Sequence, residues 1–236
     1  MEEKEEIMNL ILGRKEEKDG KRKSTLQIAL SVARYLSSYL PGQVYNTSGF
    51  IGGRVEWDNG SPDSQSRPTF EESDLFAALL LYLVSLEQVG ELFIKDTPKK
   101  DNNGIVKTLR DYTSLSNDEI QAIKGLRNAL GHNFGLVAEA DNRSRNEFGA
   151  KDYKYTLVYN SDKNDIVIEL PKEDFGNKGR PIDWGDKSEE TYTKIYPINL
   201  INLIEKEIIE KIQSDSDIKL TKNIEEIKSR FTIITE

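Results

Sequence analysis

The sequence contains no cysteine and only one histidine, His132, among its 236 residues. Without cysteine the chain forms no disulfide and offers no thiolate to a metal, and a single imidazole is too few for a histidine-rich zinc site. We therefore expect no metal and no other cofactor. Proton transfer by an imidazole near neutral pH has only one place to occur in this chain, namely His132.

Basic residues are also scarce, since 33 Lys and Arg stand against 41 Asp and Glu and give a net charge of −8. This balance argues against broad, sequence-independent binding to nucleic acid, because such binding depends on neutralising phosphates. The segment 95–127 differs, because it holds seven Lys and Arg and five Asp and Glu. Lys107, Arg110 and Lys124 in this segment are candidates for binding an anionic substrate, and a chance fluctuation of charge is the alternative.

No apolar run is long enough to cross a membrane. The longest, 75–86, has 12 residues and is flanked by acidic side chains, whereas a spanning helix needs about 20 apolar residues. Residues 1–6 are charged where a secretory signal would be apolar. We expect a cytoplasmic protein that makes no membrane contact.

The remaining composition, with 36% hydrophobic residues, suits one domain over residues 1–236 with its own core. Residues 1–23 form a charged N-terminal segment, and residues 43–70 form a long loop rich in turn residues. Between and after them, apolar residues recur at helical spacing. Helices are expected over 25–40, 71–95, 105–112, 117–130 and 197–213, with one more from 218 onward. Ser116 and Glu119 form a capping box before the fourth of these helices, and Gly131 should end it.

The pattern changes within residues 151–171. Tyr153, Tyr155 and Leu157 alternate with polar residues, and a second alternating run follows at 166–170. A turn-prone segment joins the two runs, so the sequence predicts a β-hairpin. Its tyrosines either stack on nucleobases or pack across the strands. The expected fold is therefore mainly α, a helical bundle with a small β-hairpin insertion before the C-terminal helices.

The run from Gly125 to Phe134 brings a guanidinium, an amide and the imidazole together at a helix end. Asn128 and His132 are four residues apart and share a helix face. Arg127 and His132 are five apart, about 140° around an ideal helix, so they need not meet within one chain. The alternative is that His132 only favours the helix dipole at a C-terminus and that Arg127 is an ordinary surface cation.

This run resembles the signature of the HEPN superfamily, which is an arginine followed after four to six residues by a histidine at a helix end. Arg127 and His132 are separated by four residues, and Asn128 is the polar residue commonly found after the arginine. The resemblance in order covers the helices from about 24 to 134, and the C-terminal helices more loosely. It implies an all-helical, HEPN-type bundle. Related toxins often carry a tyrosine two residues after the histidine that accepts a nucleotidyl group. Phe134 stands there without a hydroxyl, so the resemblance does not extend to this modification.

The resemblance implies a metal-independent endoribonuclease with Arg127, Asn128 and His132 as catalytic residues. His132 would move the proton of a ribose 2′-hydroxyl, and Arg127 would hold the phosphate oxygens as they gain charge. It also implies an RNA substrate, a 2′,3′-cyclic phosphate product, a homodimer with the active site at its interface, and a role in toxin–antitoxin or antiviral defence beside an antitoxin or other defence partner. The alternative function is a non-catalytic binding or assembly subunit of such a complex, which the acidic net charge and the missing tyrosine favour.

Overall fold

The computed structural model describes residues 11–12, 22–37, 70–94, 103–139, 151–159, 165–171, 191–215 and 217–234. The loop expected over 43–70 and most of the charged segment 1–23 lie outside these residues. Ile11 and Leu12 are an exception, because both are helical and fully buried in the core.

The described part of the chain is mainly helical, as the sequence predicts. The helices are α2 (Thr25–Leu36), α3 (Phe70–Leu92), α4 (Gly104–Tyr112), α5 (Asn117–Asn133), α7 (Pro197–Leu203), η2 (Ile204–Ile209), α8 (Glu210–Ser214) and α9 (Ile224–Phe231). α7, η2 and α8 follow one another without a break, and η2 is π-helical, with hydrogen bonds that span five residues. Together they form the single helix expected over 197–213.

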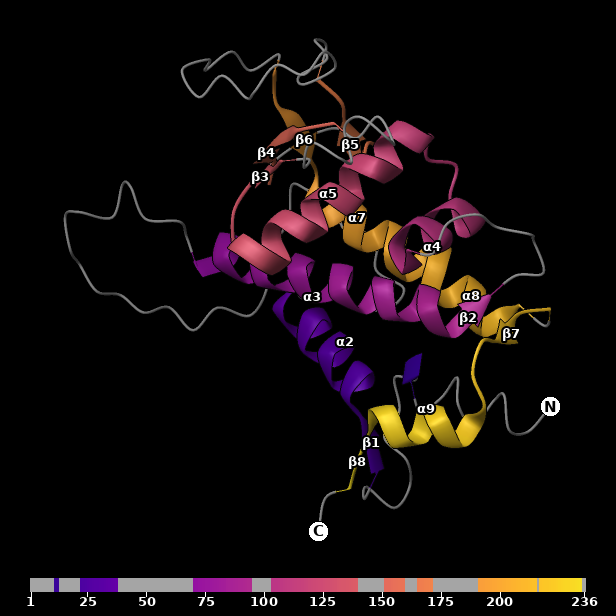
Figure 1. Cartoon of the computed structure of the whole chain (residues 1–236). Helices are drawn as coiled ribbons and strands as arrows, with labels where there is room; N and C mark the ends of the chain where they lie inside the picture. The colour runs from indigo at the N-terminus through magenta and orange to yellow at the C-terminus, as the bar shows by residue number, and fades with distance from the viewer. Residues whose placement is uncertain are drawn as a thin grey trace, which may run out of the picture.

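α3 is the central element of the bundle (Figure 1), with α2 on one side and α4, α5 and α7 on the other. Its sequence is apolar around most of its circumference, and residues along its whole length are buried in one continuous core (Leu75, Leu79, Leu83, Leu86, Leu92). A helix that is apolar on more than one face needs neighbours on more than one side. This requirement explains why α2, α4, α5 and α7 all pack against α3.

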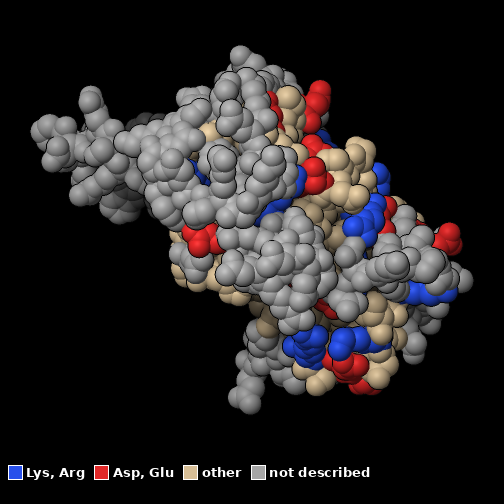
Figure 2. Space-filling model, turned by 45° about the horizontal axis from the view of Figure 1, so that its top comes forward, with Lys and Arg blue, Asp and Glu red and all other residues tan. Residues whose placement is uncertain are grey.

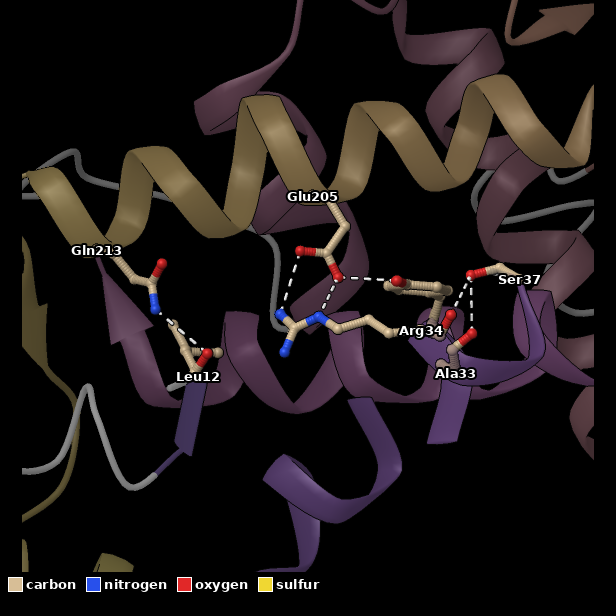
Figure 3. A network of polar contacts seen from close by, with 7 residues as sticks. Leu12, Ala33, Arg34, Ser37, Glu205 and Gln213 are labelled. Atoms are coloured by element: carbon tan, nitrogen blue, oxygen red, sulfur yellow. Dashed lines mark hydrogen bonds and ion pairs between the residues drawn. The ribbon is translucent and has the colours of Figure 1, made fainter. Parts of the chain in front are cut away.

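A buried polar network joins α2, α3 and η2 (Figure 3). Arg34 donates from Nε and Nη2 to the two carboxylate oxygens of Glu205, at 2.7 and 3.1 Å. The hydroxyl of Tyr82 donates to the same carboxylate at 2.8 Å. Glu205 is fully buried, and a buried charge is tolerated when it is paired and hydrogen-bonded. The network therefore fixes how these three elements pack against each other.

The β-structure differs from the predicted hairpin. β4 (Tyr153–Leu157) and β5 (Ile168–Glu169) form where strands were expected, but they do not pair with each other. β6 (Thr193–Ile195) lies between them, parallel to β4 and antiparallel to β5, and β3 (Val137–Ala138) pairs with the other edge of β4. The hairpin prediction was wrong because β6 is too short to show a clear alternation, although Thr193 and Ile195 both face the core.

Two short antiparallel pairs connect distant parts of the chain. β1 (Arg22–Ser24) pairs with β8 (Thr232–Ile234), and β2 (Phe93–Ile94) pairs with β7 (Lys219–Leu220). The first pair brings a strand near the start of the chain beside the last described strand (Figure 1). The second pair ends α3, which was expected to continue to residue 95.

The stretch Asp74–Leu92 of α3 is long and apolar enough, by length and composition alone, to cross a membrane. It extends beyond the apolar run 75–86 and includes the charged Glu87 and Glu91. More than half of the longer stretch is buried inside the fold, and the core helix of a soluble protein has the same composition. The absence of a membrane contact and the cytoplasmic location remain predictions.

Candidate active site

The last turns of α5 carry the three residues that the sequence singled out. The helix begins at the predicted capping box, in which the Ser116 hydroxyl accepts from the Glu119 N–H and the Glu119 carboxylate accepts from the Ser116 N–H. It does not end at Gly131 as predicted. It continues to Asn133, and Phe134 forms the cap in the left-handed conformation, with φ 48° and ψ 34°. His132 therefore lies inside the last helical turn.

Strand β4 of the sheet packs against α5 and holds this helix in place. The buried hydroxyl of Tyr155 on β4 donates to the carbonyl of Ala122 at 2.7 Å. Gly125 permits this close approach, because a Cβ there would lie 2.5 Å from the same hydroxyl. Burial raises the pKa of Tyr155 well above its usual value. Tyr153 and Tyr155 are both buried, and their rings stack on each other, so neither ring is accessible to a nucleobase.

Arg127 is the centre of the site. Its Nη1 lies 3.3 Å from Nε2 of His132 and 3.4 Å from Oδ1 of Asn128. Its Nη2 forms an ion pair with the carboxylate of Glu87 on α3. Its Nε is buried and has no hydrogen-bond partner among the described residues. The guanidinium is thus held from two sides, with Glu87 on one and the two α5 side chains on the other.

The contact between Arg127 and His132 occurs within one chain. The 140° separation on an ideal helix suggested that the two groups need not meet in this way, but the arginine side chain is long enough to reach along the helix to the imidazole. A guanidinium has donors only. Nε2 of His132 therefore acts as the acceptor, and its lone pair is directed at Nη1 of Arg127.

The imidazole is exposed to solvent, and so is Asn128, whereas Arg127 is half-buried. An exposed ring at a helix end, beside a cation whose position is fixed, is accessible to a substrate. The Nε2 atom of an imidazole can take a proton, and the N–H groups of a guanidinium can bind an anionic oxygen. The arrangement can therefore support both proton transfer and the binding of a phosphate.

Glu87 was not predicted from the sequence. Asp74, near the start of the same helix, is half-buried, and burial raises its pKa above the usual value. Glu87 is one of few charged residues in the apolar stretch of α3. That isolation is a signal for a specific role, but only the packing of α3 against α5 identifies its partner as Arg127.

No contact joins the three predicted substrate-binding residues to Arg127 or His132 among the interactions described above. Lys124 is four residues before Asn128 on the same face of α5, while Lys107 and Arg110 belong to α4, which packs against α5. On the face drawn in Figure 2, basic and acidic side chains of the described part alternate and form no continuous basic area. The binding of substrate by Lys107, Arg110 and Lys124 remains a prediction.

Within the described residues, no three histidine, aspartate or glutamate side chains come close enough together to hold a metal ion. Comparison with known proteins finds no matching family model, no matching curated sequence and no matching solved structure. The function of the site must therefore be judged from its own residues and their geometry.

Proposed function

We propose that the protein is a metal-independent endoribonuclease whose active site is formed by Arg127, Asn128 and His132. The observation that carries the proposal is the 3.3 Å contact between Nη1 of Arg127 and Nε2 of an exposed His132. It combines a proton acceptor and a phosphate-binding cation at one point on the surface. Cleavage of RNA by attack of its own 2′-hydroxyl needs these two functions and no metal.

In the proposed reaction, Nε2 of His132 takes the proton of a ribose 2′-hydroxyl. The 2′-oxygen forms a bond to the adjacent phosphorus, and the bond from phosphorus to the 5′-oxygen breaks. The leaving oxygen takes a proton from water, and the imidazolium of His132 returns its proton to the solvent. The products are a 2′,3′-cyclic phosphate and a 5′-hydroxyl. The phosphate would draw Nη1 of Arg127 away from the imidazole, which frees the lone pair of Nε2 for the 2′-hydroxyl. The guanidinium then faces the oxygens that gain negative charge.

Glu87 supports this role by fixing the guanidinium through Nη2. Nη1 remains directed toward His132, so the cation is positioned before a substrate arrives. Placement of charged groups in advance is a main source of catalytic stabilisation. Glu87 is a positioning residue in this proposal, because it acts through Arg127.

A second function is a non-catalytic binding or assembly subunit on the same helical fold. The ion pair favours it, because the Glu87 carboxylate already offsets the charge of Arg127, and the net charge of −8 weakens attraction for RNA. Such a subunit would elute with a partner in a larger complex during size-exclusion chromatography. An isolated protein that cleaves RNA would count against this function.

The HEPN-type assignment, the homodimer around the site and the role in toxin–antitoxin or antiviral defence belong to the same proposal. Their support is the resemblance of the Arg127–His132 spacing and of the helices that precede it. The contact between Arg127 and His132 within one chain means that a second copy is not needed to bring these two side chains together. A dimer would instead place two such pairs along one cleft.

The test is RNA cleavage in the presence of EDTA by the unchanged protein, by His132→Ala and by Gln121→Ala. Gln121 is an exposed residue on the same helix and serves as the control. We expect cleavage by the unchanged protein and the control, and a loss of at least about a hundredfold in His132→Ala, because general acid–base catalysis contributes that much. Equal cleavage by all three proteins would overturn the proposal.

A further inference from the structure

Phe134 has an unusual backbone for its residue type. It is the only residue other than glycine with a positive φ in the part of the chain that the structure describes. Its N–H donates to the carbonyl of Leu130 at 3.2 Å and closes the last turn of α5. Glycine and asparagine are the usual residues in this conformation, because a larger side chain adds steric strain. A phenylalanine there needs a reason other than helix capping.

The side chain of Phe134 is largely exposed to solvent. Its relative exposure is 74%, although the ring is entirely apolar. Strained backbone that persists despite its cost is found mainly at functional positions. The two observations on one residue, strain and an exposed aromatic ring, suggest that the ring is held out to contact something.

The position of Phe134 indicates what it contacts. It follows His132 by two residues, and both residues are exposed at the same end of α5. Arg127 contacts both His132 and Asn128 at this end of the helix. An exposed apolar ring at the same helix end as a cation suits a ligand that is flat and apolar on its faces and anionic along its edge. A nucleotide has both properties, since every base has a π-face and each phosphate is charged.

We infer that Phe134 stacks on a nucleobase of the RNA next to the phosphate held by Arg127. This inference rests on the proposed function, since it places the base relative to the same site. A phenyl ring forms no hydrogen bonds to base edges, so stacking tolerates any base, and any preference follows from stacking strength. Phe134 thus orients the chain of the RNA while Arg127 and His132 act on its backbone.

The experiment distinguishes the effect of the aromatic ring from the effect of the backbone strain. Phe134→Asn removes the ring and accepts the left-handed conformation, whereas Phe134→Tyr keeps an aromatic ring. Tyr35→Ala, which removes an exposed aromatic residue on α2 instead, is the matched control. Each change is made in the His132→Ala protein, so that RNA is bound without being cleaved. Binding of a fluorescently labelled single-stranded RNA oligonucleotide is then measured by anisotropy in EDTA.

We expect Phe134→Asn to raise the Kd for RNA by about tenfold, within the range for loss of one stacked base, and Phe134→Tyr and Tyr35→Ala to leave it within about twofold. The melting temperature of Phe134→Asn should stay level or rise, because the strain is relieved. An unchanged Kd in Phe134→Asn would overturn the inference. So would a change confined to self-association in sedimentation, because the ring would then contact a second copy of the chain.

The outcome is independent of the cleavage test. If the unchanged protein does not cleave RNA while Phe134→Asn weakens binding, the proposed catalysis fails and the stacking stands. If the unchanged protein cleaves RNA while Phe134→Asn binds RNA as tightly as its parent protein, the stacking fails and the proposed catalysis stands.

Discussion

Among single residues, Glu87 decides how Arg127 is oriented, and its effect can be measured. Glu87→Gln keeps the size of the side chain and removes its charge, so Nη2 of Arg127 loses its ion pair. We expect RNA cleavage to fall by about ten- to a hundredfold, since small displacements of a catalytic group cost this much. The unfolding free energy should fall by no more than about 1 kcal/mol, because the two side chains are partly exposed.

Glu91→Gln, a half-buried acid one turn further along α3, is the control for charge alone. It should leave cleavage unchanged. Cleavage that rises in Glu87→Gln would contradict the positioning role and would show that the carboxylate competes with the phosphate for the guanidinium.

Single residues also show which parts of the site could be predicted from the sequence. The motif at 127–132 could be identified from residue types and spacing alone. Its partner could not, because Glu87 is 40 residues away and no local pattern connects it to Arg127. The contact between Arg127 and His132 was likewise underestimated, because ideal helix angles describe Cα positions and not the reach of a long side chain.

Among the elements, two glycines on different helices should respond in opposite ways to the same substitution. Gly90 on α3 faces α4, where an added Cβ would lie 1.9 Å from the carbonyl oxygen of Gly104. At Gly131 on α5 the nearest atom would be 3.8 Å away, on Arg127. We expect Gly90→Ala to lower the unfolding free energy by about 1–3 kcal/mol through overpacking. Gly131→Ala should raise it by about 0.5–1 kcal/mol through helix propensity.

Urea denaturation of both variants measures these changes. The result for Gly131 also decides where α5 ends. A destabilising Gly131→Ala would mean that this residue has the left-handed conformation that its sequence position suggested, and that the helix stops before His132.

The helices were predictable from the sequence and the strand pairing was not. Capping residues and apolar periodicity located most of the described helices to within a few residues, because these signals are local. The last helix was expected from residue 218, but it begins at Ile224, and β7 occupies Lys219–Leu220 instead. Strand order depends on which segments meet in the folded chain. The parallel pairing of β4 with β6 joins residues almost 40 positions apart, and the two- and three-residue strands β3, β5 and β6 are too short to carry a period of their own.

Over the whole molecule, buried tyrosines should make the fold sensitive to alkaline pH. Burial is the largest cause that raises the pKa of Tyr82, Tyr112 and Tyr155 above the usual value. In the unfolded chain these groups ionise near pH 10. A raised pKa in the folded state gives a stability that is complete below pH 10 and declines as pH rises above it. The decline should be about 1.4 kcal/mol per pH unit for each such tyrosine.

Urea denaturation between pH 9 and 11 tests this expectation in the unchanged protein, in Tyr155→Phe and in Tyr35→Phe, whose hydroxyl is on an exposed residue. The unfolding free energy should fall less steeply with pH in Tyr155→Phe than in the unchanged protein, and equally steeply in Tyr35→Phe. An identical pH dependence in all three proteins would contradict the view that buried tyrosines cause the loss of stability at alkaline pH.

The chemistry of the RNA ends tests the central claim most directly, because it identifies the group that attacked the phosphate. Products made by the unchanged protein in EDTA are examined by phosphorus NMR beside those of His132→Ala. We predict 2′,3′-cyclic phosphate ends from the unchanged protein, none from His132→Ala, and no cleavage of an oligonucleotide whose 2′-hydroxyls are methylated. Products with 5′-phosphate and 3′-hydroxyl ends, or cleavage of the methylated substrate, would contradict attack by the 2′-hydroxyl.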